Sequence, residues 1–244
     1  MSSLSQATTV QFQTVLGDFE VNLYDQTTPV TVDNFLDYVE EQAYMDIVVH
    51  RTDNNFVVQA GGFSYDGDLP LNTVESNGSI ANEPLYSNVR GTIAMAKLPG
   101  NPNSATNQWF FNLANNSANL DVQNGGFTVF GEVTGNGMAI VDAMAALPRF
   151  NLGGAFSSLP LRDYSAEDAN NNVTPDEDNF VLIFNIVVLN AAEDTAADLQ
   201  PTPNTLINNV NDDTGSGGGA FGFLFPLLLL MLLPGKQKRA ARTN

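Results

Sequence analysis

Cysteine is the most informative absence from this 244-residue chain. Without it the protein can form no disulfide, no thiolate metal site and no cysteine nucleophile. The absence does not fix the compartment in which the protein works, because exported bacterial domains often lack cysteine too.

Basic residues are also scarce. The sequence has nine Lys and Arg against 27 Asp and Glu, a formal net charge of −18. Four of the nine basic residues stand in the last nine positions, and no acidic residue follows Asp213, so the rest of the chain carries 5 − 27 = −22. Because such a surface repels phosphate backbones, we expect no nucleic-acid partner.

Histidine occurs once, at His50, within the stretch Val49–Phe63, V-H-R-T-D-N-N-F-V-V-Q-A-G-G-F. Its apolar residues and low charge predict a mostly buried strand. The pair Gly61-Gly62 indicates a bulge or a close backbone approach where that strand ends. Burying the guanidinium of Arg51 is costly unless it has a partner or a function. Arg51 therefore marks the first candidate site.

Short apolar segments separated by turn residues make up the chain as far as residue 190. Residues 10–16 and 17–24 alternate apolar and polar side chains around a Gly-Asp turn, which predicts a β-hairpin. Helical spacing predicts one helix near 32–39 and a second over 138–147. Compact apolar segments predict further strands at 91–97, 108–113, 127–133 and 180–189. About eight strands with two short helices favour a mainly β fold, a closed eight-stranded antiparallel barrel.

The sequence predicts one folded domain with extensions at both ends. We expect an N-terminal extension over 1–7, the barrel over 8–190, an acidic and Gly-rich flexible linker over 191–219, and a hydrophobic segment with a basic C-terminus over 220–244.

Three separated motifs resemble the cyclophilin family of peptidyl-prolyl cis-trans isomerases. They are H-R-x4-F-V-x-Q-x-G at His50–Gly61, G-T-I-A-M-A at Gly91–Ala96, and N-Q-W-F-F-N with L-D and F-T-V-F-G-E-V within Asn107–Val133. Three motifs in the right order, each on a predicted strand, are far more specific than any one alone. The resemblance covers roughly residues 8–190, and the wording is closest to bacterial periplasmic members.

The resemblance implies a monomeric enzyme that rotates Xaa-Pro bonds in proline-containing polypeptides, with no metal and no cofactor. Isomerisation breaks no covalent bond, but it must lower a torsional barrier of about 18–20 kcal/mol that amide resonance creates. By resemblance, Arg51 donates a hydrogen bond to the prolyl nitrogen as it becomes pyramidal, and the fixed fork of donors in arginine suits that role. Gln59 would hold the substrate carbonyl and orient Arg51, and Phe56 completes the catalytic set.

Other residues are implied to bind substrate. Besides Phe56, the expected contacts of the proline ring and the peptide are His50, Val57, Ala96, Lys97, Gln108, Phe110, Leu120 and Phe127. Because isomerisation needs no general base, His50 is either a neighbour of the site or an ordinary packed histidine. Trp109, which precedes Phe110 on a predicted strand, should point into the core.

This chain also departs from the family pattern. Thr52-Asp53-Asn54-Asn55 replaces the usual apolar-apolar-Pro-Gly, and Asp53 could pair with Arg51 and compete with substrate. The usual residues are replaced as well at Val57, Ala60, Lys97 and Asn119. These changes predict a more open rim and poor binding of cyclosporin-type ligands. They keep an alternative open: a catalytically weak module that binds proline-containing segments as a chaperone or scaffold.

The acidic run Asp168–Asp178 has two interpretations. Its carboxylates could bind calcium, but it lacks the glycine and the terminal glutamate of an EF-hand loop. A solvated loop is the favoured interpretation.

Residues 220–244 predict an exported protein, periplasmic or at the cell surface. Ala220–Leu233 is an apolar run of 14 residues, shorter than the roughly 20 that span a bilayer comfortably, and a basic end follows. This order of a glycine run, an apolar segment and a basic end resembles the bacterial Gly-Gly type of sorting signal, which a rhomboid-like protease cleaves. A degenerate membrane anchor is the alternative. Residues 1–12 show no signal peptide, although both interpretations require export.

Overall fold

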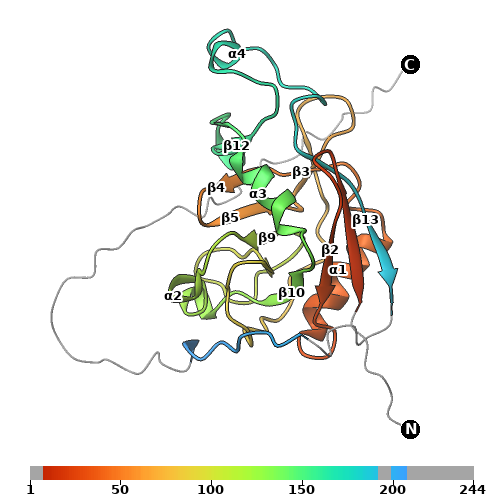
Figure 1. The fold of residues 1–244 in the computed structure, drawn as a ribbon, viewed down its shortest axis with the longest axis vertical. Helices are drawn as coiled ribbons and strands as arrows, with labels where there is room; N and C mark the ends of the chain where they lie inside the picture. The colour runs from red at the N-terminus through yellow and green to blue at the C-terminus, as the bar shows by residue number, and fades with distance from the viewer. Residues whose placement is uncertain (1–7, 192–198, 208–244) are drawn as a thin grey trace, which may run out of the picture.

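The computed structural model describes residues 8–191 and 199–207 (Figure 1). Eleven strands of these residues form one antiparallel sheet, in the order β4-β5-β9-β8-β10-β2-β1-β13-β3-β6-β7. In chain order they are β1 (Thr9–Thr14), β2 (Phe19–Leu23), β3 (Ile47–Val48), β4 (Arg51–Asp53), β5 (Val57–Ala60), β6 (Phe63–Ser64), β7 (Asn72–Thr73), β8 (Thr92–Met95), β9 (Trp109–Asn112), β10 (Val129–Val133) and β13 (Leu182–Asn190). The other two strands, β11 (Arg149–Phe150) and β12 (Leu159–Pro160), pair with each other.

Four α-helices accompany the sheet in the described part of the chain: α1 (Pro29–Glu40), α2 (Ser117–Leu120), α3 (Met138–Ala146) and α4 (Ala166–Asn170). Two short 3-10 turns lie at Gln123–Gly125 and Gly154–Phe156. The prediction of two helices is therefore wrong. It recovered α1 and α3, whereas α2 and α4 span about one turn each, too few residues to show a helical period.

The mainly β fold is confirmed, and so is the N-terminal hairpin. β1 pairs with β2 through Val10–Val21 and Phe12–Phe19, and its other edge pairs with β13. The ladders of the described residues begin at β4 and end at β7, with no ladder between these two strands, so they trace a curled sheet rather than the predicted closed barrel of eight strands.

The single strand predicted across Val49–Phe63 is a hairpin instead. β4 and β5 are joined by a turn at Asn54-Asn55, where Asn55 has a φ of +53°. Asparagine tolerates this left-handed conformation better than most residues, and the two polar residues end the strand. The turn brings Arg51 and Gln59 directly opposite each other, which one continuous strand could not do.

Aromatic side chains dominate the main core. Phe12, Phe35, Trp109 and Phe111 are fully or almost fully buried, and their rings meet in stacked and edge-on contacts. Trp109 belongs to this core, as the sequence predicts, while Phe110 points to the opposite face of β9.

The polar segment 149–179 is more structured than a loop. It contains β11, β12 and α4, and Figure 1 shows α4 projecting beyond the sheet. In the acidic run, Asp168 caps α4, because its carboxylate accepts from the backbone N–H and the hydroxyl of Ser165. Within residues 8–191 and 199–207, no group of three or more His, Asp or Glu side chains is placed to hold a metal ion.

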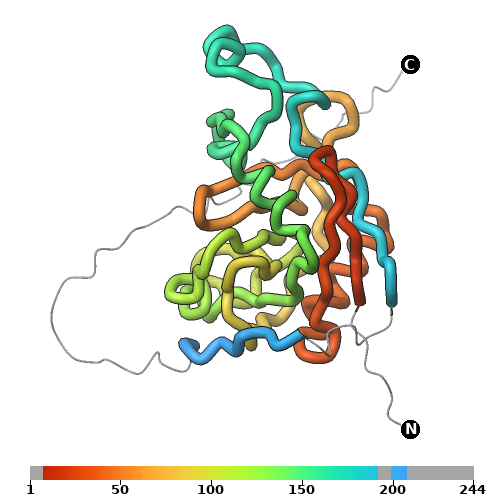
Figure 2. The backbone as a smooth tube through the Cα atoms, in the orientation of Figure 1, coloured from red at the N-terminus to blue at the C-terminus, as the bar shows by residue number. Residues whose placement is uncertain are grey.

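Residues 199–207 lie within the predicted linker, yet they dock on the domain. Figure 2 shows this segment in blue, running along one side of the domain towards the loops around α2. Pro203 forms a bridge with Tyr86, and Asn204 is buried. No helix of the described residues is long and apolar enough to cross a membrane. The predicted tail at 220–244 lies outside the described residues.

Candidate functional site

The strand register aligns the central residues of the predicted site. Arg51 on β4 faces Gln59 on β5, Gln59 faces Phe110 on β9, and Phe110 faces Ala94 on β8. Residues directly opposite each other in antiparallel strands present their side chains to the same face of the sheet. Arg51, Gln59 and Phe110 therefore form one row across three strands.

A chain of side-chain hydrogen bonds fixes the polar end of this row. Arg51 Nη1 donates to Gln59 Oε1 at 3.1 Å, and Gln59 Nε2 donates to Gln108 Oε1 at 2.9 Å. The amide of Gln59 thus has both ends engaged, which orients the guanidinium. Two of the five guanidinium N–H groups sit on Nη2, which lies 3.4 Å from Asp53 Oδ2.

The glycines after β5 make room for this chain. A Cβ on Gly61, whose φ is +87°, would collide with the carbonyl oxygen of Asn107, and one on Gly62 would stand 2.6 Å from Gln108 Nε2. The close backbone approach predicted for the pair is confirmed. In its present position the Gln108 side chain occupies the space that a side chain on residue 62 would fill.

Next to the polar row lies an apolar cluster, here called the site floor. Its buried members are Val57, Phe110, Leu120 and Phe127, with Phe56 and Ala96 partly exposed against them. Phe110 and Phe127 meet edge-on at 5.9 Å between ring centroids. The guanidinium carbon of Arg51 is 5.9 Å from the ring centroid of Phe56. The structure therefore places a fixed cation beside an apolar surface.

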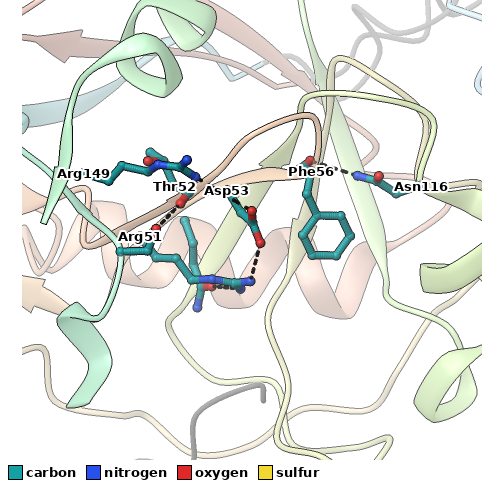
Figure 3. A network of polar contacts seen from close by, with 8 residues as sticks. Arg51, Thr52, Asp53, Phe56, Asn116 and Arg149 are labelled. Carbon is teal, nitrogen blue, oxygen red and sulfur yellow. Dashed lines mark hydrogen bonds and ion pairs between the residues drawn. The ribbon is translucent and has the colours of Figure 1, made fainter. Parts of the chain in front are cut away.

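Asp53 lies between two arginines (Figure 3). Arg51 Nη2 is 3.4 Å from Asp53 Oδ2, and Arg149 Nη1 is 3.9 Å from Asp53 Oδ1. Burial lowers the pKa of Arg51, and the charge of Asp53 acts in the opposite direction. Arginine remains protonated under either influence. The pairing with Asp53 was predicted; the contribution of Arg149, from the β11–β12 ladder about a hundred residues away, has no signal in the sequence.

The ammonium of Lys97 is bound to backbone carbonyl oxygens. The residue is 3% exposed, and its ammonium donates to the carbonyl oxygens of Asn124 and Gly126 at 2.9 and 2.5 Å. It also lies 4.8 Å from the ring centroid of Phe127. Burial lowers the pKa of Lys97 to about 8. Lys97 therefore binds the loop that precedes Phe127. The sequence instead led us to expect Lys97 along the bound peptide.

His50 is also set apart from the floor. Its side chain is buried, and its ring packs edge-on against Phe63 at 5.1 Å. Burial, followed by the charge of Arg51, lowers the pKa of His50 to about 3, so the imidazole is neutral near pH 7. The structure places it as a packed neighbour behind Arg51.

Sequence reasoning missed a set of buried amides behind the site. Asn116 donates to the backbone carbonyl of Phe56 at 2.9 Å, as Figure 3 shows, and to Asn112 Oδ1 at 2.7 Å. Asparagine is so frequent in this chain that composition gives no warning of these positions. Their common place behind the floor emerges only from the fold.

Comparison with known proteins gives consistent results. Residues 9–163 match the family model described as cyclophilin type peptidyl-prolyl cis-trans isomerase/CLD. A peptidyl-prolyl cis-trans isomerase of Acinetobacter baylyi is 38% identical over 152 residues, which span 60% of this chain and 76% of that protein. Peptidyl-prolyl cis-trans isomerase B of Escherichia coli is 36% identical over 162 residues, 65% of this chain and 96% of the relative.

Solved structures share the fold. A cyclophilin type peptidyl-prolyl cis-trans isomerase of Cryptosporidium parvum superimposes with a TM-score of 0.54, at 19% identity, over 75% of this chain and 98% of its own. A second crystal structure of that protein, determined in the presence of the dipeptide Ala-Pro, gives the same TM-score at 20% identity.

Proposed function

The chain belongs to the family of cyclophilin-type peptidyl-prolyl cis-trans isomerases, and on that basis we propose that Arg51, Gln59 and the site floor catalyse cis-trans rotation about Xaa-Pro bonds. The substrates are proline-containing polypeptides. No metal or cofactor takes part in the proposed reaction, because a rotation transfers neither electrons nor a chemical group.

The geometry supports separate roles for the apolar site floor and for Arg51. The apolar floor receives the proline ring, and the residue before the proline turns relative to that ring about the amide bond. As the amide twists, its resonance is lost and the prolyl nitrogen gains a lone pair that can accept a hydrogen bond. Arg51 donates to that nitrogen. The bond is stronger in the twisted state than in either planar isomer, so it lowers the barrier, and each 1.36 kcal/mol of such selective stabilisation is worth about tenfold in rate.

The observation that carries this proposal is the fixed position of Arg51. Gln59, itself held by Gln108, fixes the guanidinium beside Phe56 at the edge of the floor. Such a donor needs little rearrangement when the transition state forms, and preorganisation of this kind is usually the largest single contribution to catalysis.

A protease-coupled assay with Xaa-Pro peptides tests the proposal. We expect the intact chain to accelerate isomerisation, and Arg51→Ala to lose most of that acceleration. If the chain binds such peptides without accelerating rotation, the second candidate function holds: a binding or chaperone module. The observation that favours this second candidate is Asp53, whose carboxylate engages the same guanidinium that the substrate needs.

We propose further that the protein is exported and acts as a monomer on exported polypeptides, aiding their folding in the periplasm or at the cell surface. The support comes from the composition of residues 220–244, an apolar run followed by basic residues. Mass spectrometry of the protein from its native source tests this proposal. Termination near residues 217–219 supports cleavage of a sorting signal, an intact Asn244 in a membrane fraction supports the anchor, and a full-length protein recovered from the cytoplasm contradicts both.

A further inference from the structure

Residues 199–207, here called the C-terminal strap, are fastened to the domain by several hydrogen bonds. The N–H and the hydroxyl of Ser87 donate to the carbonyl oxygens of Thr202 and Pro203, at 2.8 and 3.1 Å. The N–H of Asn204 donates to the Leu85 carbonyl at 2.8 Å. The strap lies beyond residues 9–163, the part of the chain that matches the family model.

Asn204 connects the strap to the loop after α2. Its Nδ2 donates to the Asp121 carbonyl at 2.9 Å, and its Oδ1 accepts from the N–H groups of Leu206 and Ile207. One side chain therefore shapes the end of the strap and holds the residue that follows Leu120. Asn204 and Asp121 are both buried, so water does not compete for these bonds.

A continuous network of buried amides begins at Asp121. Its Oδ1 accepts from the N–H and Nδ2 of Asn88, at 2.8 and 3.0 Å. Asn112 Nδ2 donates to Asn88 Oδ1 at 3.3 Å, and Asn116 Nδ2 donates to Asn112 Oδ1 at 2.7 Å. Asn116 also donates to the carbonyl of Phe56. The network thus leads from the strap to Phe56 at the edge of the site floor.

The same network holds the other side of the floor. Asn88 Nδ2 donates to the Phe127 carbonyl at 3.1 Å, and the N–H of Phe127 donates to the Leu120 carbonyl at 2.8 Å. The strap also packs beneath this loop: a Cβ on Gly126 would stand 3.2 Å from Ile207 Cδ1. Lys97 binds the carbonyl of the same Gly126. The strap and Lys97 therefore both contact Gly126, the residue that precedes Phe127.

One oxygen of the network has no partner. Asp121 Oδ2 is buried without a hydrogen bond among the described residues. A half-satisfied buried carboxylate is costly, and the remaining bonds and close packing must hold it in place. We therefore expect the network to rearrange when the hydrogen bond from Asn204 to Asp121 is removed.

We propose that the C-terminal strap positions the substrate-binding floor of the isomerase through this network, with Asn204 as the positioning residue. The inference rests on the proposed function. It adds to the site a segment that lies outside residues 9–163, the part that matches the family model. Leu120, Phe127 and Phe56 bind the proline ring in the geometry that the strap maintains. The Arg51–Gln59–Gln108 chain has no described bond to the strap, so the rotation step itself does not depend on it.

Variants of the full chain separate this role from a general effect on stability. Asn204→Asp keeps the oxygen that accepts from Leu206 and Ile207 but replaces the donor to Asp121 with a repelling oxygen. We expect KM for an Xaa-Pro peptide to rise about three- to tenfold, the scale of one buried hydrogen bond, with kcat within about twofold of the wild type. Thr202→Ala is the matched control, because the Thr202 side chain is exposed and its backbone bond to Ser87 is retained. It should leave both constants unchanged.

Amide hydrogen exchange of the same variants provides a readout that needs no activity. Asn204→Asp should speed exchange at residues 116–127 and leave β5, Val57–Ala60, as protected as in the wild type. Faster exchange throughout the chain, or a fall in kcat with KM unchanged, would show a general structural defect and overturn the proposal, as would wild-type behaviour of Asn204→Asp. A wild-type chain that fails to isomerise contradicts the proposed function instead. In that case the exchange pattern alone decides whether the strap positions the floor.

Discussion

Asp53 is the residue that most distinguishes the polar side of this site. It stands in a position where the family pattern usually has an apolar residue, and it lies within 4 Å of both Arg51 and Arg149. Exposed ion pairs contribute little, about 0.2–1 kcal/mol, and Asp53 is about one-third exposed. Its influence on Arg51 is therefore modest, and Arg149 shares the carboxylate.

Removing the charge of Asp53 should favour the reaction. In Asp53→Asn, Arg51 Nη2 no longer faces a carboxylate, so we expect kcat/KM to increase about two- to fivefold, in proportion to the lost pair. Steady-state kinetics on one Xaa-Pro peptide measure the change. Asp18→Asn, which removes an exposed charge elsewhere, is the control and should have no effect. A decrease in Asp53→Asn would mean that the carboxylate orients Arg51 rather than competing for it.

His50 should make the fold sensitive to acid. Its pKa falls from 6.5 to about 3 on folding, because burial disfavours the imidazolium. The unfolded chain therefore binds a proton between these pH values that the folded chain does not, and stability is lost as the pH falls below 6.5. From pH 6.5 to 5 the loss amounts to about 2 kcal/mol.

Urea unfolding at a series of pH values measures this loss, with His50→Gln as the reference. The variant has no titrating group at position 50, so the difference in unfolding free energy between wild type and variant should change by about 2 kcal/mol over that interval. Parallel curves for the two proteins would contradict this, because they would show that His50 has the same pKa in the folded and the unfolded chain.

For single residues, the sequence predicts which residues form the site better than it predicts the direction of their side chains. The motif identified Arg51, Phe56 and Gln59, and the fold brings them together. It could not show that Lys97 turns towards the carbonyl oxygens of Asn124 and Gly126. The direction of a long side chain depends on which loop passes beneath it, and local sequence does not contain that information.

Among the elements, α1 has a cap that comes from a distant loop. Its N-cap residue, Thr28, makes no side-chain capping bond. Glu83 takes that role: its carboxylate accepts from the N–H of Val30, and from the N–H and hydroxyl of Thr31 at 2.9 and 2.7 Å. A carboxylate at a helix N-terminus also interacts favourably with the helix dipole.

Replacing Glu83 should destabilise the protein without touching the site. We expect Glu83→Ala to lower the free energy of unfolding by about 1 kcal/mol, and Glu83→Gln by less, because the amide oxygen can still accept. Glu75→Ala, which changes an exposed glutamate of the same polar region, serves as control. Chemical unfolding compares the three variants. Equal stability of Glu83→Ala and Glu75→Ala would contradict the capping role.

Long periodic elements are predictable from sequence, and short ones are not. β1 and α1 follow clear patterns because each buries one face over several residues. The break between β4 and β5 depends on two asparagines within an otherwise strand-like stretch. The strap was predicted to be part of a linker because the sequence there turns acidic and then rich in Pro, Asn and Gly. Its docking depends on backbone groups of Leu85, Ser87 and Asp121, which carry no sequence signature.

In the molecule as a whole, the described fold extends beyond the region that matches the family model. The match ends at residue 163, but β13, from 182 to 190, pairs with β1 and β3, and the strap supports the floor from beyond it. One edge of β1 is therefore paired by residues outside the match, and so is the proposed positioning of the floor. The isomerase is best studied as the full chain.

Two-dimensional NMR exchange spectroscopy on an Ala-Pro peptide gives the decisive comparison, because it reports binding and rotation in the same sample. The series is the wild type, Arg51→Lys, Arg51→Ala and, as a control, Arg162→Ala, whose arginine binds the carbonyl oxygens of Phe180 and Glu177. We predict fast rotation with the wild type and the control. Rotation should slow about a hundredfold or more with Arg51→Ala, because the donor to the twisted amide is lost, and also slow with Arg51→Lys, because lysine lacks the planar fork. Rotation that is equally fast with Arg51→Ala and the wild type would contradict the assignment of Arg51 as the catalytic donor.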